Sequence, residues 1–231
     1  MNAPFGSPRL HLRDATSTND RARQLAIAGA PHGTVVTASH QSAGRGRQGR
    51  TWSAPPGHAL LMTVIVRDPP RLLPLVGAVA IAEALGPDVG IKWPNDLHLD
   101  GRKVCGILAE GRPAEGWAVL GAGVNVAVRL EDLPPELHAT AATLGRSPAD
   151  VEPLLAAILG RFAHWLGQPV PDLLDAWRAR DVLRGREITW ADGRGVAEGV
   201  DDAGELLVRR EDGTVATLSA GEVHLGATQA P

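Results

Sequence analysis

The chain has 231 residues, a formal net charge of -3 at pH 7 and a hydrophobic content of 44%. This length suits one large domain with a small second one, and the composition is that of a globular rather than a disordered protein. The slightly negative charge provides no overall field that would attract DNA, RNA or an anionic membrane, so any basic binding site must be local.

The cysteine content and the N-terminus indicate the compartment. The single cysteine, Cys105, cannot form an intramolecular disulfide and lies in an apolar run where any small hydrophobic residue would serve. Residues 1–13 lack the pattern of a secretory signal peptide, and no apolar run reaches the roughly 18 residues that span a membrane. We therefore expect a cytoplasmic protein with no membrane partner.

Helical periodicity and strand-like runs are mixed along the first 183 residues. Apolar residues at three- and four-residue spacing predict a helix opening at Ser17 and a last one after Pro171, with two more between them. Strands are predicted over residues 34–38, 60–66, 89–93, 103–109 and 117–126. This mixture predicts an α+β domain. The apolar positions of the last three helices are Leu72, Leu75, Val79 and Ala82, then Leu155, Ile158, Phe162 and Trp165, then Leu173, Leu174 and Trp177.

The sequence changes character after about Arg184. Short apolar runs are separated by Asp192-Gly193, Ala203-Gly204 and Asp212-Gly213. Asp-Gly pairs between apolar runs are typical of β-hairpins, because their tight turns require a positive φ. The even spacing predicts a small β-barrel, so we divide the chain into domains at 1–183 and 184–231.

The most informative stretch is a predicted loop, residues 41–52, that holds three glycines and three arginines between two strands. Glycines let the backbone approach a ligand closely, and the arginines concentrate charge suited to phosphate and carboxylate. The loop lacks the Gly-Lys-Ser/Thr ending of a P-loop and the spacing of a dinucleotide fold. A solvated surface loop or an arginine-glycine RNA-binding segment is the alternative, although such RNA segments are usually repeated and disordered.

Two further segments place polar groups beside predicted strands. We expect Pro94, Asn95 and Asp96 to leave the sheet, since proline cannot donate to a strand ladder and Asn and Asp favour turns. Asp96 could then face a metal-bound phosphate, while a plain hairpin is the simpler explanation. The segment from Gly121 to Asn125 is glycine-rich with one amide, which on its own indicates no more than close sheet packing.

Lys103 precedes a buried-looking strand. Strict alternation places Lys103, Cys105 and Ile107 on one face and Val104, Gly106 and Leu108 on the other. If the first face lines a pocket, Lys103 is a shielded cation that needs an anion. Most lysines beside a strand are simply exposed.

Five motifs together carry a family resemblance over residues 11–126. They closely resemble the biotin-protein ligases, and the C-terminal barrel is similar to the one that ends these enzymes. The resemblance implies a mixed sheet with flanking helices, as in class II aminoacyl-tRNA synthetases and biotin ligases, plus a small SH3-like β-barrel. The motifs are Ser17-Thr18-Asn19, Gln41-x-x-Gly-Arg-Gly-Arg-x-Gly-Arg-x-Trp52, Lys92-Trp-Pro-Asn-Asp-Leu97, Lys103-x-x-Gly-Ile-Leu-x-Glu110 and Gly121-x-Gly-x-Asn125.

The resemblance implies an ATP-dependent ligase. Biotin would be activated as biotinyl-5'-AMP, with Mg²⁺ and ATP, and transferred to a lysine of the biotin carboxyl carrier protein of acetyl-CoA carboxylase. No enzyme nucleophile is needed, because the mixed anhydride is already an activated acyl group. Lipoate- or octanoate-transferring enzymes are the nearest alternative, and the Gly-Arg-Gly-Arg loop with Lys-Trp-Pro-Asn-Asp favours biotin.

The resemblance also implies residue roles. The expected catalytic cations are Lys103, Arg47 and Lys92, with Lys103 between the biotin carboxylate and the ATP α-phosphate. Either Asp96 or Asn125 would lie near Mg²⁺. The expected biotin-binding residues are Ser17, Thr18, Asn19, Gln41, Gly44, Arg45, Gly46, Arg47, Trp52, Lys103 and Gly106, and the expected ATP- and phosphate-binding residues are Arg45, Arg47, Arg50, Lys92, Asn95, Asp96 and Asn125.

Two departures from the family bear on function. The Ser-Thr-Asn motif begins at residue 17, which leaves no room for the winged-helix domain of the repressor members, so we expect no DNA binding. Residues 127–146 lack the aromatic residue that caps adenine in certain relatives and offer only His138. The sequence allows a homodimer without predicting one, and the C-terminal barrel either completes the nucleotide pocket or merely docks on the catalytic domain.

Overall fold

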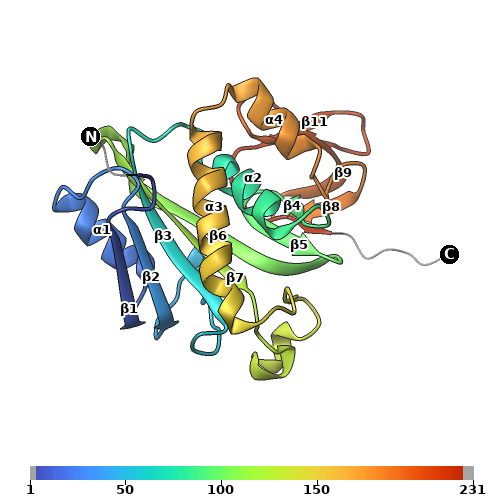
Figure 1. Cartoon of the computed structure of the whole chain (residues 1–231). Helices are drawn as coiled ribbons and strands as arrows, with labels where there is room; N and C mark the ends of the chain where they lie inside the picture. The colour runs from blue at the N-terminus through green and yellow to red at the C-terminus, as the bar shows by residue number, and fades with distance from the viewer. Residues whose placement is uncertain (1–3, 226–231) are drawn as a thin grey trace.

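The computed structural model describes residues 4–225, which form two β-sheets joined through helices (Figure 1). The larger sheet has seven strands in the order β1-β2-β3-β7-β6-β5-β4, and only β1 and β2 run parallel. The mixed sheet predicted for the first domain is therefore confirmed. Its strands are β1 (Arg9–Ala15), β2 (Val35–Gln41), β3 (Ala59–Arg67), β4 (Gly90–Lys92), β5 (Asp96–Leu99), β6 (Arg102–Arg112) and β7 (Trp117–Asn125).

Helices cover the two faces of this sheet unequally. On one face α2 (Leu73–Leu85) and α3 (Val151–Leu166) bury the main apolar core against β3 and β7. On the other, α1 (Thr18–Ile27) packs through Ala22 and Ala26 against Ile65 and Val119 in a separate small core. Figure 1 shows α1 beside β1 and β2, far from the strands β4 and β5. Within residues 4–225, the part of that second face beyond the N-terminal end of α1, at β4, β5 and β6, carries no α-helix.

All four predicted helices form. The last, α4 (Val170–Arg178), begins two residues earlier than predicted and carries Pro171 in its first turn, where a missing N–H breaks no helical hydrogen bond. None of the helices within residues 4–225 is both long and apolar enough to cross a membrane.

The C-terminal sheet contains five antiparallel strands in the order β11-β10-β9-β8-β12, which agrees with the small β domain predicted. Gly204 and Gly213 adopt φ values of 78° and 83° between strands, as the turn signals predict. Trp93 anchors this sheet to the first domain, because its Nε1 donates to the Gly204 carbonyl at 3.1 Å. The strands are β8 (Glu187–Trp190), β9 (Gly193–Val200), β10 (Leu206–Arg209), β11 (Val215–Leu218) and β12 (His224–Leu225).

Two strands of the large sheet, β1 at its edge and β5 inside it, are absent from the sequence prediction. The prediction that Asp96 leaves the sheet is wrong: Pro94 and Asn95 make the turn, and Asp96 pairs directly with Lys92 and Gly106 as the first residue of β5. The hairpin alternative is therefore correct. Strand β1 was missed because only three of its seven residues are even partly buried, so its apolar pattern is weak.

The prediction about the faces of β6 is also wrong. Leu97 pairs with Cys105, but His98 pairs with Lys103, so β6 contains one extra residue at this point. Such a β-bulge reverses the alternation of the residues before it. Both Val104 and Cys105 are therefore buried in the main core, while Lys103 shares the open face with Gly106.

Asp181 lies where the chain leaves α4 for the C-terminal sheet, bridged to Ile91 of β4. Its Oδ1 accepts the Leu183 N–H at 2.8 Å, whereas its Oδ2 is buried without a partner in the described chain. Burial raises the pKa of the Asp181 carboxyl above its ordinary value, against the smaller opposing effect of the backbone hydrogen bonds.

We expect Asp181→Asn to stabilise the protein at neutral pH, because it keeps an acceptor for Leu183 and removes a poorly solvated charge. The folded pKa lies above the unfolded one, so the penalty is absent below the unfolded pKa and complete above the folded pKa. Urea unfolding should give a gain of about 1 kcal/mol at pH 7 that vanishes near pH 3. The exposed Asp175→Asn is the control, and an Asp181→Asn protein no more stable than wild type at pH 7 contradicts the assignment.

Candidate active site

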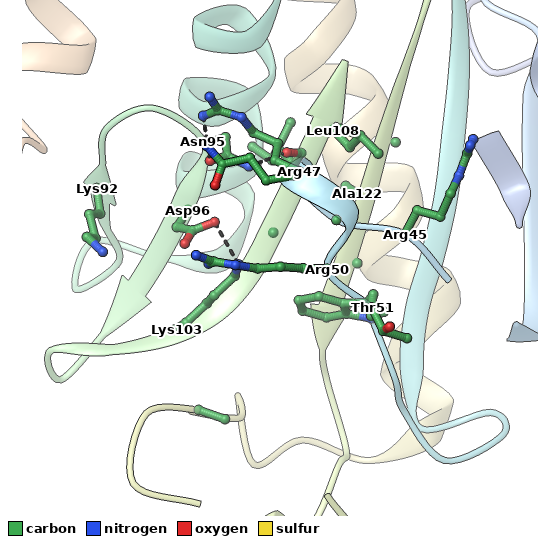
Figure 2. Close-up of a pocket in the computed structure, with 18 of the residues that line it drawn as sticks. Arg45, Arg47, Arg50, Thr51, Lys92, Asn95, Asp96, Lys103, Leu108 and Ala122 are labelled. Atoms are coloured by element: carbon green, nitrogen blue, oxygen red, sulfur yellow. Dashed lines mark hydrogen bonds and ion pairs between the residues drawn. The ribbon is translucent and has the colours of Figure 1, made fainter. Parts of the chain in front are cut away.

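A cavity of about 470 Å³ opens on the helix-free part of the large sheet. It gathers segments from the beginning of α1, the loop after β2, the β4–β5 hairpin, β6 and β7 (Figure 2). Of the predicted site residues, Gly44 alone is not part of its lining. The predicted residues that line it are Ser17, Thr18, Asn19, Gln41, Arg45, Gly46, Arg47, Arg50, Trp52, Lys92, Asn95, Asp96, Lys103, Gly106 and Asn125.

The floor of the cavity is bare backbone. A Cβ atom at Gly121 would overlap the Asn19 amide, and one at Gly123 would overlap the indole of Trp52. Gly106, opposite Gly123 in the neighbouring strand, has Trp52 and Lys103 at contact distance from the same open face. These glycines are therefore required by the side chains packed directly over them, which form part of the cavity wall.

One end of the cavity is neutral and polar. The Gln41 Oε1 atom accepts hydrogen bonds from the Thr18 backbone N–H at 2.7 Å and from the Thr18 hydroxyl at 3.0 Å. It thereby satisfies a helix N-terminus that the Ser17 side chain does not cap. With its oxygen used in this way, Gln41 presents its Nε2 donor.

Asn19 lines the cavity, but its own hydrogen-bonding groups are occupied. Its Nδ2 donates to Glu110 at 2.8 Å and to the Leu108 carbonyl at 3.3 Å, and its Oδ1 accepts from Thr63 at 2.7 Å. The side chain, 4% exposed, therefore braces α1 against β3 and β6. Thr63 and Glu110 were not among the predicted site residues.

The opposite end is cationic. Lys103 Nζ lies 2.7 Å from Asp96 Oδ1 and 5.8 Å from the centre of the Trp52 ring (Figure 2). Burial lowers the pKa of Arg47 and also that of Lys92, in each case against the opposing charge of Asp96. Desolvation disfavours the charged forms of Arg47 and Lys92, and a bound anion would offset this cost by pairing with them.

The C-terminal sheet contributes to the same end. Arg47 donates to Asn95 Oδ1 at 3.3 Å and to the Gly221 carbonyl at 3.2 Å, and Arg50 forms an ion pair with Glu222. Gly221 and Glu222 line the cavity, so this segment completes the pocket rather than merely docking. Arg47 and Gly221 lie 174 positions apart in the sequence. No sequence signal relates residues at that separation, so this contact was not predicted.

Arg45 departs from the predicted arrangement. Figure 2 shows its side chain extending away from Lys103 and Asp96. Its guanidinium lies 2.7 Å from Asp20 and 3.0 Å from Glu110. The guanidinium predicted to bind phosphate is thus paired with carboxylates through Nη2, while its buried Nε has no partner in the described chain.

The remaining wall is mostly apolar and includes Leu133, Leu137 and Ala141. Asn125 stands beside it with its Nδ2 donating to the Ala142 carbonyl at 2.9 Å and its Oδ1 buried without a partner among the described residues. His138 is turned to the Leu133 carbonyl at 2.8 Å and is not part of the lining.

His98 was not predicted to belong to the site, yet it lines the cavity from β5. Its Nδ1 lies 3.2 Å from the Gly101 carbonyl, and burial lowers its pKa with a smaller contribution from Lys92. A neutral imidazole with Nδ1 protonated would present Nε2 as an acceptor.

Comparison with known proteins gives the family. A model described as "Biotin/lipoate A/B protein ligase family" matches residues 12–125, and one described as "Biotin protein ligase C terminal domain" matches residues 183–226. The biotin--[acetyl-CoA-carboxylase] ligase of Paracoccus denitrificans is 34% identical over 93% of this chain and 99% of its own, and that of Mycobacterium tuberculosis is 33% identical over 90% and 86%.

A solved structure agrees with these sequence matches. The biotin protein ligase from Aquifex aeolicus, in complex with biotin and ATP, superposes with a TM-score of 0.81 at 26% identity, covering 95% of this chain and 99% of that one. With its fold, its cavity and its five motifs in agreement, the chain belongs to the biotin-protein ligase family.

Proposed function

We propose that this chain, an ATP-dependent biotin-protein ligase, carries out both of its reaction steps in the one cavity. Biotin is first activated as biotinyl-5'-AMP and then transferred to a lysine of the biotin carboxyl carrier protein of acetyl-CoA carboxylase. The observation that carries the proposal is the asymmetry of the cavity, which is neutral and polar at Gln41 and cationic at Lys103, Arg47 and Lys92. Biotin has the same asymmetry, with a neutral ureido ring at one end and a carboxylate at the other.

The ureido ring would lie at the Thr18 and Gln41 end. Its carbonyl accepts and its two N–H groups donate, so the free Nε2 of Gln41 and the nearby Ser17 hydroxyl offer complementary groups. The bicyclic ring would then lie beside Trp52 over β6 and β7, which directs the carboxylate toward Lys103.

The first step joins two anions. A carboxylate oxygen of biotin attacks the α-phosphorus of ATP, the bond to the bridging oxygen breaks, and pyrophosphate leaves. Lys103, Arg47 and Lys92 supply fixed positive charge in a partly shielded site, where it stabilises developing charge better than in water. In the second step the carrier lysine, as a free amine, attacks the acyl carbon, and AMP leaves.

The donors of the cavity fit Mg²⁺ bound together with ATP. Asp96 offers a carboxylate, and the Asn125 Oδ1 atom is buried without a partner in the described chain. No group of three His, Cys, Asp or Glu side chains gathers within residues 4–225, and protein Mg²⁺ sites commonly combine one or two carboxylates with substrate phosphates. We propose that Asp96 and Asn125 hold the ion with the nucleotide, where it neutralises phosphate charge.

Several expectations from the sequence stay predictions. We keep the domain division at 1–183 and 184–231, noting that the first strand of the second sheet begins at Glu187. The reduced Cys105, buried with its pKa raised by that burial, is consistent with the proposed cytoplasmic location.

A transfer assay tests the proposed function. The purified chain is offered ATP, Mg²⁺, the carrier domain and either biotin or lipoate, and the carrier is weighed by mass spectrometry. We expect the mass of one biotinyl group on one lysine, with pyrophosphate released. Preferential attachment of lipoate, or RNA binding without biotin-dependent pyrophosphate exchange, would overturn the proposal.

Replacing Lys103 should slow adenylate formation. We expect Lys103→Ala to lower the single-turnover rate by about a hundredfold, because loss of one preorganised charge at a developing anion costs about 3 kcal/mol. The neighbouring exposed Arg102→Ala is the matched control and should adenylate biotin at the wild-type rate. An unchanged rate in Lys103→Ala would contradict the role given to Lys103.

A further inference from the structure

We infer that Arg45 of the cavity wall and three charged side chains outside the cavity lining form a tether that holds the glycine-arginine loop over the cavity, with Glu110 as its central positioning residue. This ion ring comprises Asp20 and Arg23 of α1, Arg45 of the loop and Glu110 of β6. The inference rests on the proposed function, because it assigns to the ring the retention of the adenylate between the two steps.

The geometry of the ring is closed. Asp20 Oδ1 lies 2.7 Å from Arg45 and 2.6 Å from Arg23, while Glu110 lies 3.0 Å from Arg45 and 3.3 Å from Arg23 through its two separate oxygens. Two cations and two anions therefore alternate, and each charge has two opposite neighbours. In an isolated surface ion pair, both side chains stay largely solvated and can move apart. In a closed network each side chain is held by two partners, which restricts its movement.

The ring is partly shielded and continuous with the wall of the cavity. Its side chains are between 23% and 36% exposed. Glu110 Oε2 also accepts from Asn19, whose Oδ1 accepts from Thr63, and Thr63 lies 2.8 Å from the Thr18 hydroxyl. A chain of hydrogen bonds thus joins Arg45 to the polar end of the cavity.

The loop has few other anchors. Gly46 donates to the Arg50 carbonyl at 2.7 Å and Trp52 to the Gly44 carbonyl at 2.9 Å, so the segment is a small hairpin bonded to itself. Residues 47–49 bury no side chain. In the described chain the tip of the hairpin is attached through Arg47 to Asn95 and Gly221 and through Arg50 to Glu222. Its base is held by Trp52, by the Arg45 ring and by backbone hydrogen bonds from residues 42 and 43 to the end of β1.

The ring should affect loop opening without affecting the chemistry. Asp20 and Glu110 lie outside the lining of the 470 Å³ cavity and instead border a second hollow on the outer side of the loop. Neither carboxylate is directed at the cationic end that holds Lys103. Weakening the ring would therefore let the loop open more often and release the adenylate, while the rate of its formation stays the same.

Glu110→Gln tests the inference, since it removes one negative charge and keeps an oxygen for Asn19. Two rates are measured with biotin, ATP and Mg²⁺ in the absence of carrier: single-turnover adenylate formation and escape of the adenylate into solution. We expect escape to be roughly three- to tenfold faster and formation to change by less than about twofold. Glu152→Gln, which breaks the Arg9 ion pair at 2.6 Å far from the loop, is the matched control and should change neither rate.

A double mutant separates a tether from a general loss of structure. Arg45→Gln should accelerate escape to a similar extent, and Glu110→Gln added to Arg45→Gln should produce little further change, because both remove the same link. Should Glu110→Gln fold poorly, Asp20→Asn interrupts the same ring from α1 and is expected to behave like it.

The outcomes distinguish this inference from the proposed function. A wild-type protein that forms no adenylate overturns both. A wild-type protein that forms and holds the adenylate, together with a Glu110→Gln protein that holds it equally firmly, overturns the tether alone. Additive effects of the Glu110 and Arg45 substitutions, or an equal slowing of adenylate formation, would assign these residues to other roles.

Discussion

The site depends on a strip of sheet without side chains. Gly106, Gly121 and Gly123 lie on β6 and β7 next to the cavity, and Asn19, Trp52 and Lys103 pack where Cβ atoms would otherwise stand or make tight contacts. Any larger residue would displace these side chains and fill the space above the strands. The cavity is thus a consequence of local backbone exposure, and the polar and charged groups around it are positioned by the elements that border the strip.

The second constraint is electrostatic. A chain with a net charge of -3 concentrates Arg47, Arg50, Lys92 and Lys103 around one end of this cavity, where Asp96 and Glu222 provide the opposing charge. Partial burial makes Arg47 and Lys92 poorly solvated, so their most favourable partners are ligand carboxylates and phosphates. The loop that supplies Arg47 and Arg50 also carries Arg45, whose guanidinium belongs to the ion ring, so we propose that this one loop both contacts the ligand and closes over it.

Much of the fold and of the candidate site was predictable from the sequence, because the signals for them are local. Helical periodicity identified α1 to α4, the Asp-Gly turns identified the second sheet, and the motif residues converge on one cavity as their family resemblance implies. The features that the sequence did not predict depend on contacts between distant segments or on a single inserted residue. The bulge before Cys105 reverses the face of Lys103, and the outward direction of Arg45 is decided by Asp20 and Glu110, which lie on other elements.

The most direct test of the central claim is a crystal structure of the protein with biotinyl-5'-AMP. The account predicts the fused ring near Gln41 above the glycine strip, and phosphate oxygens within hydrogen-bonding distance of Lys103 Nζ and the Arg47 guanidinium. A complex in which the phosphate lies remote from both cations, or in which the ligand binds away from β6 and β7, would contradict it.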